Sequence, residues 1–167
     1  MSIRFLIPLL PLVFLETACA VSLRAQAAGT VRSMTDLGIQ GGLSAAAGRP
    51  AGKHGLLLAG LDANAGAFGR NPAGDGSAKI EYLRFSPRYA WTFSLHAGER
   101  FSGDDRGFIV IAQGIVLEPF ARSNPAGYLG ATLWFGWGTG DDSVRGGILG
   151  VGLLWEFCDL FRWSGDL

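Results

Sequence analysis

Residues 129–137 read LGATLWFGW and residues 149–157 read LGVGLLWEF. In both stretches every odd-numbered position is apolar, whereas the even-numbered positions are mostly glycine or polar. Side chains of a β-strand alternate between two faces with period two, so each stretch has one apolar face and one face of mostly glycine and polar residues, which we call the lean face. The pattern predicts long β-strands.

The same alternation runs through most of the chain. It predicts six extended segments, near residues 35–47, 55–68, 79–97, 108–120, 128–138 and 146–158. In the third segment Pro87 cannot donate a ladder hydrogen bond, so residues 86–88 form either a bulge or a turn that splits the segment. Residues 21–31 are a candidate for a further strand. We therefore expect a single domain over residues 35–163, all-β, an antiparallel up-and-down meander that closes into a barrel of about eight strands.

The composition narrows the class of protein. Charged residues make up 17% of the 167 residues, and 26 residues are glycine, which argues against a soluble helical protein. The formal net charge is zero and no cluster of Lys and Arg follows the chain, so nucleic acid is not an expected partner. The glycines lie in strands and no P-loop is present, so no nucleotide or other cofactor is expected.

The N-terminal residues 1–20 have the pattern of a signal peptide. Arg4 supplies the positive charge, and residues 5–15 form an apolar run that is too short to cross a bilayer as a helix. Cleavage by ordinary signal peptidase fits Ala-Cys-Ala at 18–20 or Ala-Gln-Ala at 25–27. We expect an exported protein of a bacterial envelope.

A second interpretation of the leader is a lipoprotein signal, in which Cys19 becomes the lipidated N-terminus. Thr17, Ala18 and Cys19 resemble the end of a lipobox, although Glu16 stands where lipoproteins carry an aliphatic residue. The other cysteine, Cys158, has no partner once the leader is removed, and we expect it to be a small packed residue.

The lean strand faces suggest which side of the strands meets lipid. A solvated face normally carries Lys, Glu, Thr and Arg, whereas exposed glycine weakens a strand. Only two lysines are present, and glycine occupies the lean positions 130, 136, 150 and 152. A narrow barrel interior favours such small residues, so the bulky face is expected to meet lipid.

Aromatic residues gather toward the ends of the predicted strands, as in the girdles of transmembrane barrels. They are Tyr89, Trp91, Phe120, Tyr128, Trp134, Phe135, Trp137, Trp155 and Phe157. With this leader, these strands and these aromatics, residues 35–163 resemble the small outer-membrane β-barrels of Gram-negative bacteria. Those proteins usually end on an aromatic residue, whereas this sequence continues past Trp163 to Leu167.

The resemblance implies a barrel in the outer membrane, surrounded by membrane lipid, with a structural or surface-interaction role. An aqueous pore is not expected, because barrels of about eight strands fill their own interior. Two alternatives remain open. One is a soluble or lipid-anchored periplasmic barrel, similar to lipocalins, that binds an apolar small molecule; the other is an outer-membrane lipid hydrolase.

The hydrolase hypothesis rests on Ser94 and His96, with Glu99 just beyond. Residues two apart share a strand face, but at roughly 7 Å they are too far apart for the direct contact that a nucleophile and its base need. The hypothesis that requires no catalysis is a network of polar side chains inside the barrel, in which charges are paired because an unpaired buried charge is costly. Its predicted members are Asp62, Arg84, Arg88, Ser94, His96, Glu118 and Glu156.

Two pairs of aspartates are predicted at loop tips, Asp104 with Asp105 and Asp141 with Asp142. If the two loops converged, their oxygens would suit calcium, but neither stretch has the spacing of an EF-hand. The histidines have no second histidine or cysteine at the spacing of a zinc site. We therefore predict solvated turns at these tips and no metal site.

Overall fold

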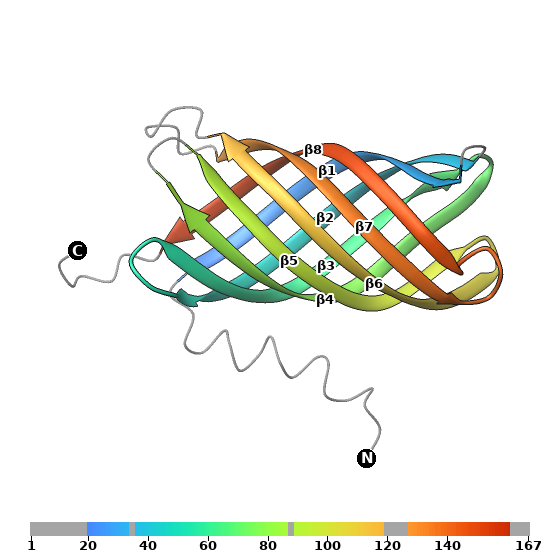
Figure 1. Ribbon diagram of the computed structural model, residues 1–167, viewed down its shortest axis with the longest axis horizontal. Helices are drawn as coiled ribbons and strands as arrows, with labels where there is room; N and C mark the ends of the chain where they lie inside the picture. The colour runs from blue at the N-terminus through green and yellow to red at the C-terminus, as the bar shows by residue number, and fades with distance from the viewer. Residues whose placement is uncertain (1–19, 34–35, 87–88, 119–126, 161–167) are drawn as a thin grey trace, which may run out of the picture.

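The computed structural model describes residues 20–33, 36–86, 89–118 and 127–160. Each strand pairs with the next one in antiparallel orientation, and pairing between the last and the first strand closes the barrel (Figure 1). The predicted fold class is therefore confirmed. The strands are β1 (Ala20–Ser33), β2 (Asp36–Pro50), β3 (Gly55–Phe68), β4 (Asn71–Phe85), β5 (Ala90–Ser102), β6 (Asp105–Glu118), β7 (Tyr128–Gly140) and β8 (Gly146–Leu160).

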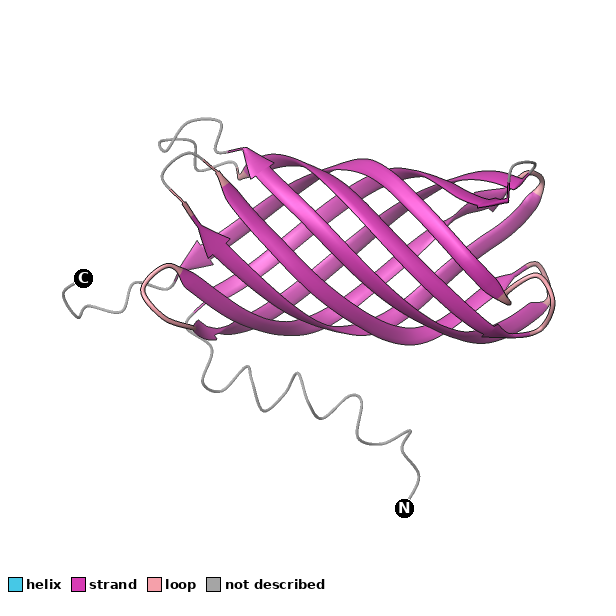
Figure 2. Cartoon of the chain, viewed as in Figure 1, coloured by secondary structure: helices cyan, strands magenta, loops and turns pink. Residues whose placement is uncertain are grey.

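Strands and short connections make up the described chain (Figure 2). In the part of the chain that the structure describes, no helix is long and apolar enough to cross a membrane.

The strand register fixes the width of the barrel. Following directly opposed residues once around the eight strands, from Ala20 on β1, leads back to β1 at Thr30, ten residues further on. Eight strands with this stagger tilt by about 40° and enclose a backbone cylinder of about 8 Å radius. The interior of such a cylinder is narrow enough for side chains to fill it completely. The walk passes through Gly48, Leu58, Glu81, Ser94, Gln113, Trp134 and Gly150.

The strand count depended on two stretches, 21–31 and 79–97. Residues 21–31 belong to β1, so the barrel begins at Ala20, earlier than residue 35. The segment 79–97 is divided between β4 and β5 by a turn in which the Ser86 N–H donates to the Tyr89 carbonyl at 2.9 Å. The turn reverses the alternation, so that Leu83 faces inward on β4 while Arg84 is exposed on the outside.

The two ends of the barrel differ. We call the end where β1 begins and β8 ends the terminal rim; it carries the connections 51–54, 86–89 and 119–127. The opposite end is the turn rim, where the connections 34–35, 69–70 and 103–104 have two residues each. Only the β7–β8 connection, 141–145, is longer there.

Apolar side chains close the interior toward both rims. Near the terminal rim the buried cluster includes Leu56, Leu58, Leu83, Ile115 and Leu117. Near the turn rim a second cluster contains Phe68, Ala73, Ile109, Ile111, Trp134 and Ile148. Buried polar side chains lie between and beside these clusters, so the interior is filled and no open channel is expected along the axis.

Inward-facing glycines make room for larger neighbours. A Cβ added at Gly150 would overlap the Trp134 indole, and one added at Gly42 would overlap the Asn64 amide. The two larger side chains lie across these glycines on adjacent strands. The lean inner face therefore allows a narrow barrel to hold bulky and polar groups.

Candidate functional site

A cluster of paired charges lies in the barrel interior, in the half toward the terminal rim. The Arg24 Nη2 donates to Glu81 Oε1 at 2.5 Å and to Glu156 Oε2 at 3.0 Å. Lys79 Nζ donates to the other Glu81 oxygen at 2.7 Å, and Ser22 Oγ donates to Glu156 Oε1 at 2.7 Å. The four charged side chains are fully buried.

The strand register brings this cluster together. Arg24 on β1 lies directly opposite Glu156 on β8, and Lys79 and Glu81 share the inner face of β4. Arg24 therefore joins neighbouring β8 to β4, which is three strands away around the wall. Two cations face two carboxylates, which is the arrangement that makes buried charge tolerable.

A chain of amide side chains continues the polar interior. Gln113 Nε2 donates to Gln26 Oε1 at 2.9 Å, and Gln26 Nε2 donates to Asn64 Oδ1 at 2.8 Å. Asn64 Nδ2 then donates to Asp62 Oδ2 at 2.6 Å and to Asp75 Oδ1 at 2.9 Å. The chain crosses the lumen from β6 through β1 to β3 and β4, so the opposite walls are cross-linked.

The structure brings Ser94 and His96 into contact, contrary to the distance argument from the sequence. Ser94 Oγ and His96 Nε2 are 2.8 Å apart because the two side chains lean toward each other along β5. On the other side of the ring, His96 Nδ1 lies 3.9 Å from Asp62 Oδ2. Ser94, His96 and Asp62 therefore lie in the same order as the nucleophile, the base and the orienting carboxylate of a serine hydrolase.

This arrangement has no route for a substrate among the described residues. Ser94 and His96 are 0% and 2% exposed, and apolar layers lie toward both rims. Glu99, the carboxylate suggested by the sequence, is exposed on the outer face and does not join them. Nucleophilic catalysis requires that the acyl carbon of a substrate can approach the serine hydroxyl. Because Ser94 is buried, the Ser94–His96 contact is better explained by a structural role.

The structure places the predicted interior residues in three groups. Asp62, Ser94, His96 and Glu156 face the interior. Arg84 points outward, because the turn after Phe85 reverses the alternation that had assigned it to the inner face. Arg88 and the side chain of Glu118 lie outside the described part of the structure.

Five buried charges of the described residues were missing from the sequence prediction: Arg24, Asp75, Lys79, Glu81 and Arg100. Arg24 lies in the stretch 21–31, where a strand competed with a signal-peptide cleavage site, and Lys79 and Glu81 were not assigned to either face of the segment 79–97. A usable signal was present, since Lys79 and Glu81 are opposite charges two residues apart in a strand.

Arg100 occupies the interior near the turn rim. Its side chain is almost fully buried, and its Cζ lies 5.3 Å from the centre of the Phe68 ring. Asp75 lies directly opposite on β4, and no Arg100 nitrogen donates to a protein acceptor in the described residues.

The aspartate loops converge through hydrogen bonds at the turn rim. The Arg106 N–H donates to Asp141 Oδ2 at 2.8 Å, and the Ser143 N–H donates to Asp105 Oδ2 at 3.1 Å. Asp104 and Asp142 remain exposed. Among the described side chains, no group of three or more His, Cys, Asp or Glu residues is placed to hold a metal ion.

No protein-family model, curated protein or solved structure matches this chain. Its class is therefore defined by its fold alone, as a small eight-stranded antiparallel β-barrel.

Proposed function

We propose that this protein is an outer-membrane β-barrel with a structural role in a bacterial envelope. The observation that carries the proposal is the direction of its side chains. Its interior holds paired charges and amides, whereas large apolar side chains cover the outside. A water-soluble protein normally has the opposite arrangement.

The outer surface has the layout expected of a surface in lipid. Its exposed side chains include Leu43, Leu95, Leu133, Val151 and Leu153, each more than half exposed. From Trp91 to Phe101 the outward positions of a strand tilted by about 40° span about 25 Å along the barrel axis, which is the height of the apolar band of outer-membrane barrels.

Aromatic side chains lie toward both edges of this band. Tyr82 and Trp91 pack edge to face near the terminal rim, with ring centres 5.9 Å apart, and Trp155 stacks on Phe157 at 6.4 Å. Trp137 is exposed toward the turn rim. Amphipathic rings favour the boundary between lipid and water, which supports a membrane-spanning orientation.

The periplasmic alternative requires an apolar cavity inside the barrel. A lipocalin-like barrel holds its ligand in its interior. Here the interior contains the charged cluster around Arg24 and the amide chain around Asn64. An apolar ligand would have to displace these hydrogen-bonded groups, so the membrane barrel is favoured.

The connections at the turn rim favour a structural role over the display of flexible loops. The described β3–β4 and β5–β6 connections have two residues each, and the β7–β8 connection is hydrogen-bonded to Asp105 and Arg106. Val144, in the middle of this connection, is fully buried. The turn rim is therefore compact, and the cross-linked interior stabilises a closed barrel.

Cell fractionation combined with gel migration tests this function. An outer-membrane barrel is expected in the membrane fraction after alkaline carbonate washing. Its unheated form should migrate differently from its boiled form, because a closed barrel resists unfolding by detergent. Release of an unlipidated chain with the periplasmic contents would overturn the proposal.

A further inference from the structure

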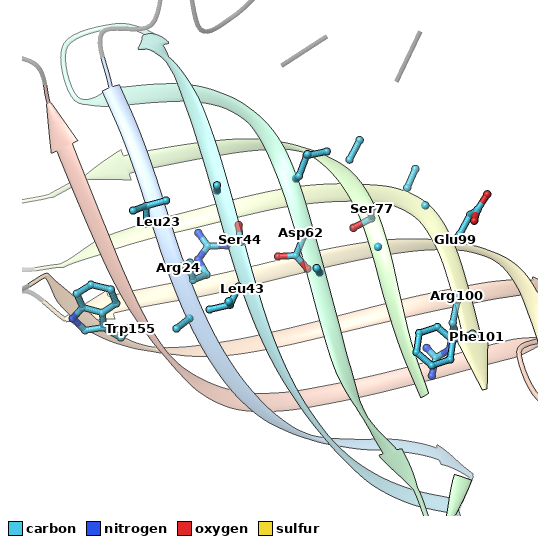
Figure 3. Close-up of a pocket in the computed structure, with 18 of the residues that line it drawn as sticks. Leu23, Arg24, Leu43, Ser44, Asp62, Ser77, Glu99, Arg100, Phe101 and Trp155 are labelled. Atoms are coloured by element: carbon cyan, nitrogen blue, oxygen red, sulfur yellow. The ribbon is translucent and has the colours of Figure 1, made fainter. Parts of the chain in front are cut away.

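A groove of about 1300 Å³ crosses the outer face of the barrel. Its lining runs from Trp155 on β8 to Phe101 on β5, and these two residues lie at opposite ends of the close-up in Figure 3. The groove is hollowed into the outer surface because outward positions on β1, β3, β4 and β5 carry alanine or glycine. They are Ala25, Ala63, Gly76, Ala78 and Ala97.

The floor follows one row of directly opposed residues. Trp155 lies opposite Ala25, Ala25 opposite Leu43, Leu43 opposite Ala63, Ala63 opposite Gly76, and Gly76 opposite Glu99. The row crosses five strand spacings, so it is about 24 Å long. Because the row runs perpendicular to strands that tilt by about 40°, it spans about 15 Å along the barrel axis, which is the depth of one of the two acyl-chain layers of a hydrocarbon core of about 30 Å.

One end of the groove carries two opposite charges. Glu99 is exposed on the outer face of β5 and is the charged residue among the otherwise apolar outward positions 91–101 of that strand. Arg106 lies on β6 opposite Phe101, its Cζ 5.3 Å from the centre of that ring. The two charged residues are diagonal neighbours, with Cβ atoms roughly 7–8 Å apart.

Among the described contacts, neither Glu99 nor Arg106 has an ion-pair partner within the protein. No described side chain lies within 4.0 Å of Glu99 as an ion-pair partner. Arg106 Nη1 donates to the Gly103 and Asp105 carbonyls, both at 3.1 Å, which leaves Nη2 and Nε without a described acceptor. An ionised group on a lipid-facing surface is costly and calls for a partner.

We propose that the groove binds a phospholipid whose headgroup carries an ammonium, as phosphatidylethanolamine does. The ammonium pairs with Glu99, the phosphate accepts hydrogen bonds from Arg106, and one acyl chain lies over Ala63 and Ala25 toward Trp155. This inference rests on the proposed membrane location.

Charge and shape together favour a lipid of this type. An anionic lipid without an ammonium would place its negative charge beside Glu99, so it should bind less well. The groove is long, and its floor is lined by small and apolar side chains, which suits a flexible hydrocarbon chain. Arg106 lies at the turn rim, where the apolar band ends and a headgroup would be.

Native mass spectrometry of the full-length barrel tests the proposal. The protein, extracted in mild detergent, is given equal amounts of phosphatidylethanolamine and phosphatidylglycerol. We expect roughly two- to fivefold more of the former to be retained, the range of an exposed charge pair. Glu99→Gln should bring the ratio close to one, whereas Arg106→Gln should lower retention of both lipids without changing the ratio.

A matched pair of alanine variants tests the groove itself. Ala63→Phe fills the floor and should reduce retention of both lipids severalfold. Ala131→Phe adds the same ring at an exposed outward position on β7, outside the groove, and should leave retention unchanged.

Three outcomes would overturn the lipid site while leaving the membrane barrel intact. They are a retention ratio near one for the heat-modifiable wild-type barrel, an unchanged ratio in Glu99→Gln, and a second protein chain in place of lipid. A wild-type chain that shows no heat-modifiable form in detergent would instead contradict the proposed function, and the lipid site with it.

Discussion

At the scale of single residues, the buried charges of the barrel depend on one another. Arg24 and Lys79 both donate to Glu81, and Arg24 also donates to Glu156. These four buried charges compensate one another for the loss of hydration only when all four are present, because each is neutralised by its neighbours. The loss of one carboxylate leaves an excess positive charge in an interior without exposed polar surface.

Glu81→Gln is therefore expected to destabilise the barrel by about 3–5 kcal/mol, the usual cost of breaking a buried ion pair from one side. The midpoint of urea unfolding, followed by the loss of the heat-modifiable form, measures the effect. Asp142→Asn, at an exposed loop position, is the matched control and should shift the midpoint little. Equal midpoints for both variants would contradict the role given to the charged cluster.

The inner glycines give a second prediction at this scale. Gly150→Ala places a methyl group where the Trp134 indole lies, so we expect a loss of roughly 1–3 kcal/mol, as in other overpacked interiors. Gly114→Ala is the control, because its nearest neighbour is a carbonyl oxygen 3.9 Å away and it faces outward. The same unfolding assay compares them, and a similar loss in both would show that the indole is not the cause.

At the scale of elements, the alternation of side chains predicted most strands but not their relative faces. The period-two pattern was clear in β7 and β8, where apolar residues stand at every odd position of 129–137 and 149–157. It failed in β4 because a turn at residues 86–89 reverses the parity, and a proline alone does not distinguish a bulge from a turn. The sequence left Asp62, Glu118 and Glu156 open as partners of Ser94 and His96, because the choice depends on strand order and register; the structure places Asp62 Oδ2 3.9 Å from His96 Nδ1.

If the N-terminal residues are a leader, as the sequence predicts, the first strand limits where it can be cleaved. Ala25, Gln26 and Ala27 lie inside β1, so cleavage after Ala27 would remove Arg24 from the charged cluster. We predict a mature chain that begins at Cys19 or Val21. The intact mass of the protein from membranes measures this, and a chain that begins at Ala28 would contradict the position of β1.

Lipidation of the leader cysteine is a separate prediction of the lipoprotein alternative. If Cys19 is the lipidated N-terminus, a fatty-acid probe should label the wild-type protein and fail to label Cys19→Ala. Labelling that persists in the variant would remove this alternative. The result bears on the anchor only, because the barrel begins at the next residue.

The β7–β8 connection gives a prediction on pH. Hydrogen bonds from the Ser143 hydroxyl and amide hold the pKa of Asp105 below its ordinary value of 3.8. A depressed carboxyl pKa stabilises the folded loop above that value, and this contribution is lost as the pH falls through the folded-state pKa. Asp105 lies at the turn rim, in contact with water.

We expect protection of the Ser143 amide against hydrogen exchange, corrected for its intrinsic rate, to stay constant from neutral pH to about pH 4 and to fall below it. In Asp105→Asn the protection should be lower at neutral pH and should no longer depend on acidity. A wild-type profile that is flat down to pH 2 would contradict the assigned hydrogen bonds.

At the scale of the whole molecule, the account depends on which surface faces lipid. Composition and glycine on the lean faces predicted a barrel with its bulky side outward, and the inward Arg24, Asp62 and Glu156 agree with that direction. The location in a membrane could not be derived from the alternation alone, because a soluble barrel alternates as well. The reversed polarity of the closed barrel is the stronger argument.

Two tryptophans on β7 allow the direction to be measured. Trp134 faces the interior and is 6% exposed, whereas Trp137, three residues further on, faces outward and is 56% exposed. Two single-tryptophan proteins, with phenylalanine at the other four positions, are inserted into vesicles of brominated phospholipid. The account predicts strong quenching of Trp137 fluorescence by the acyl-chain bromines and little quenching of Trp134; equal quenching, or stronger quenching of Trp134, would contradict it.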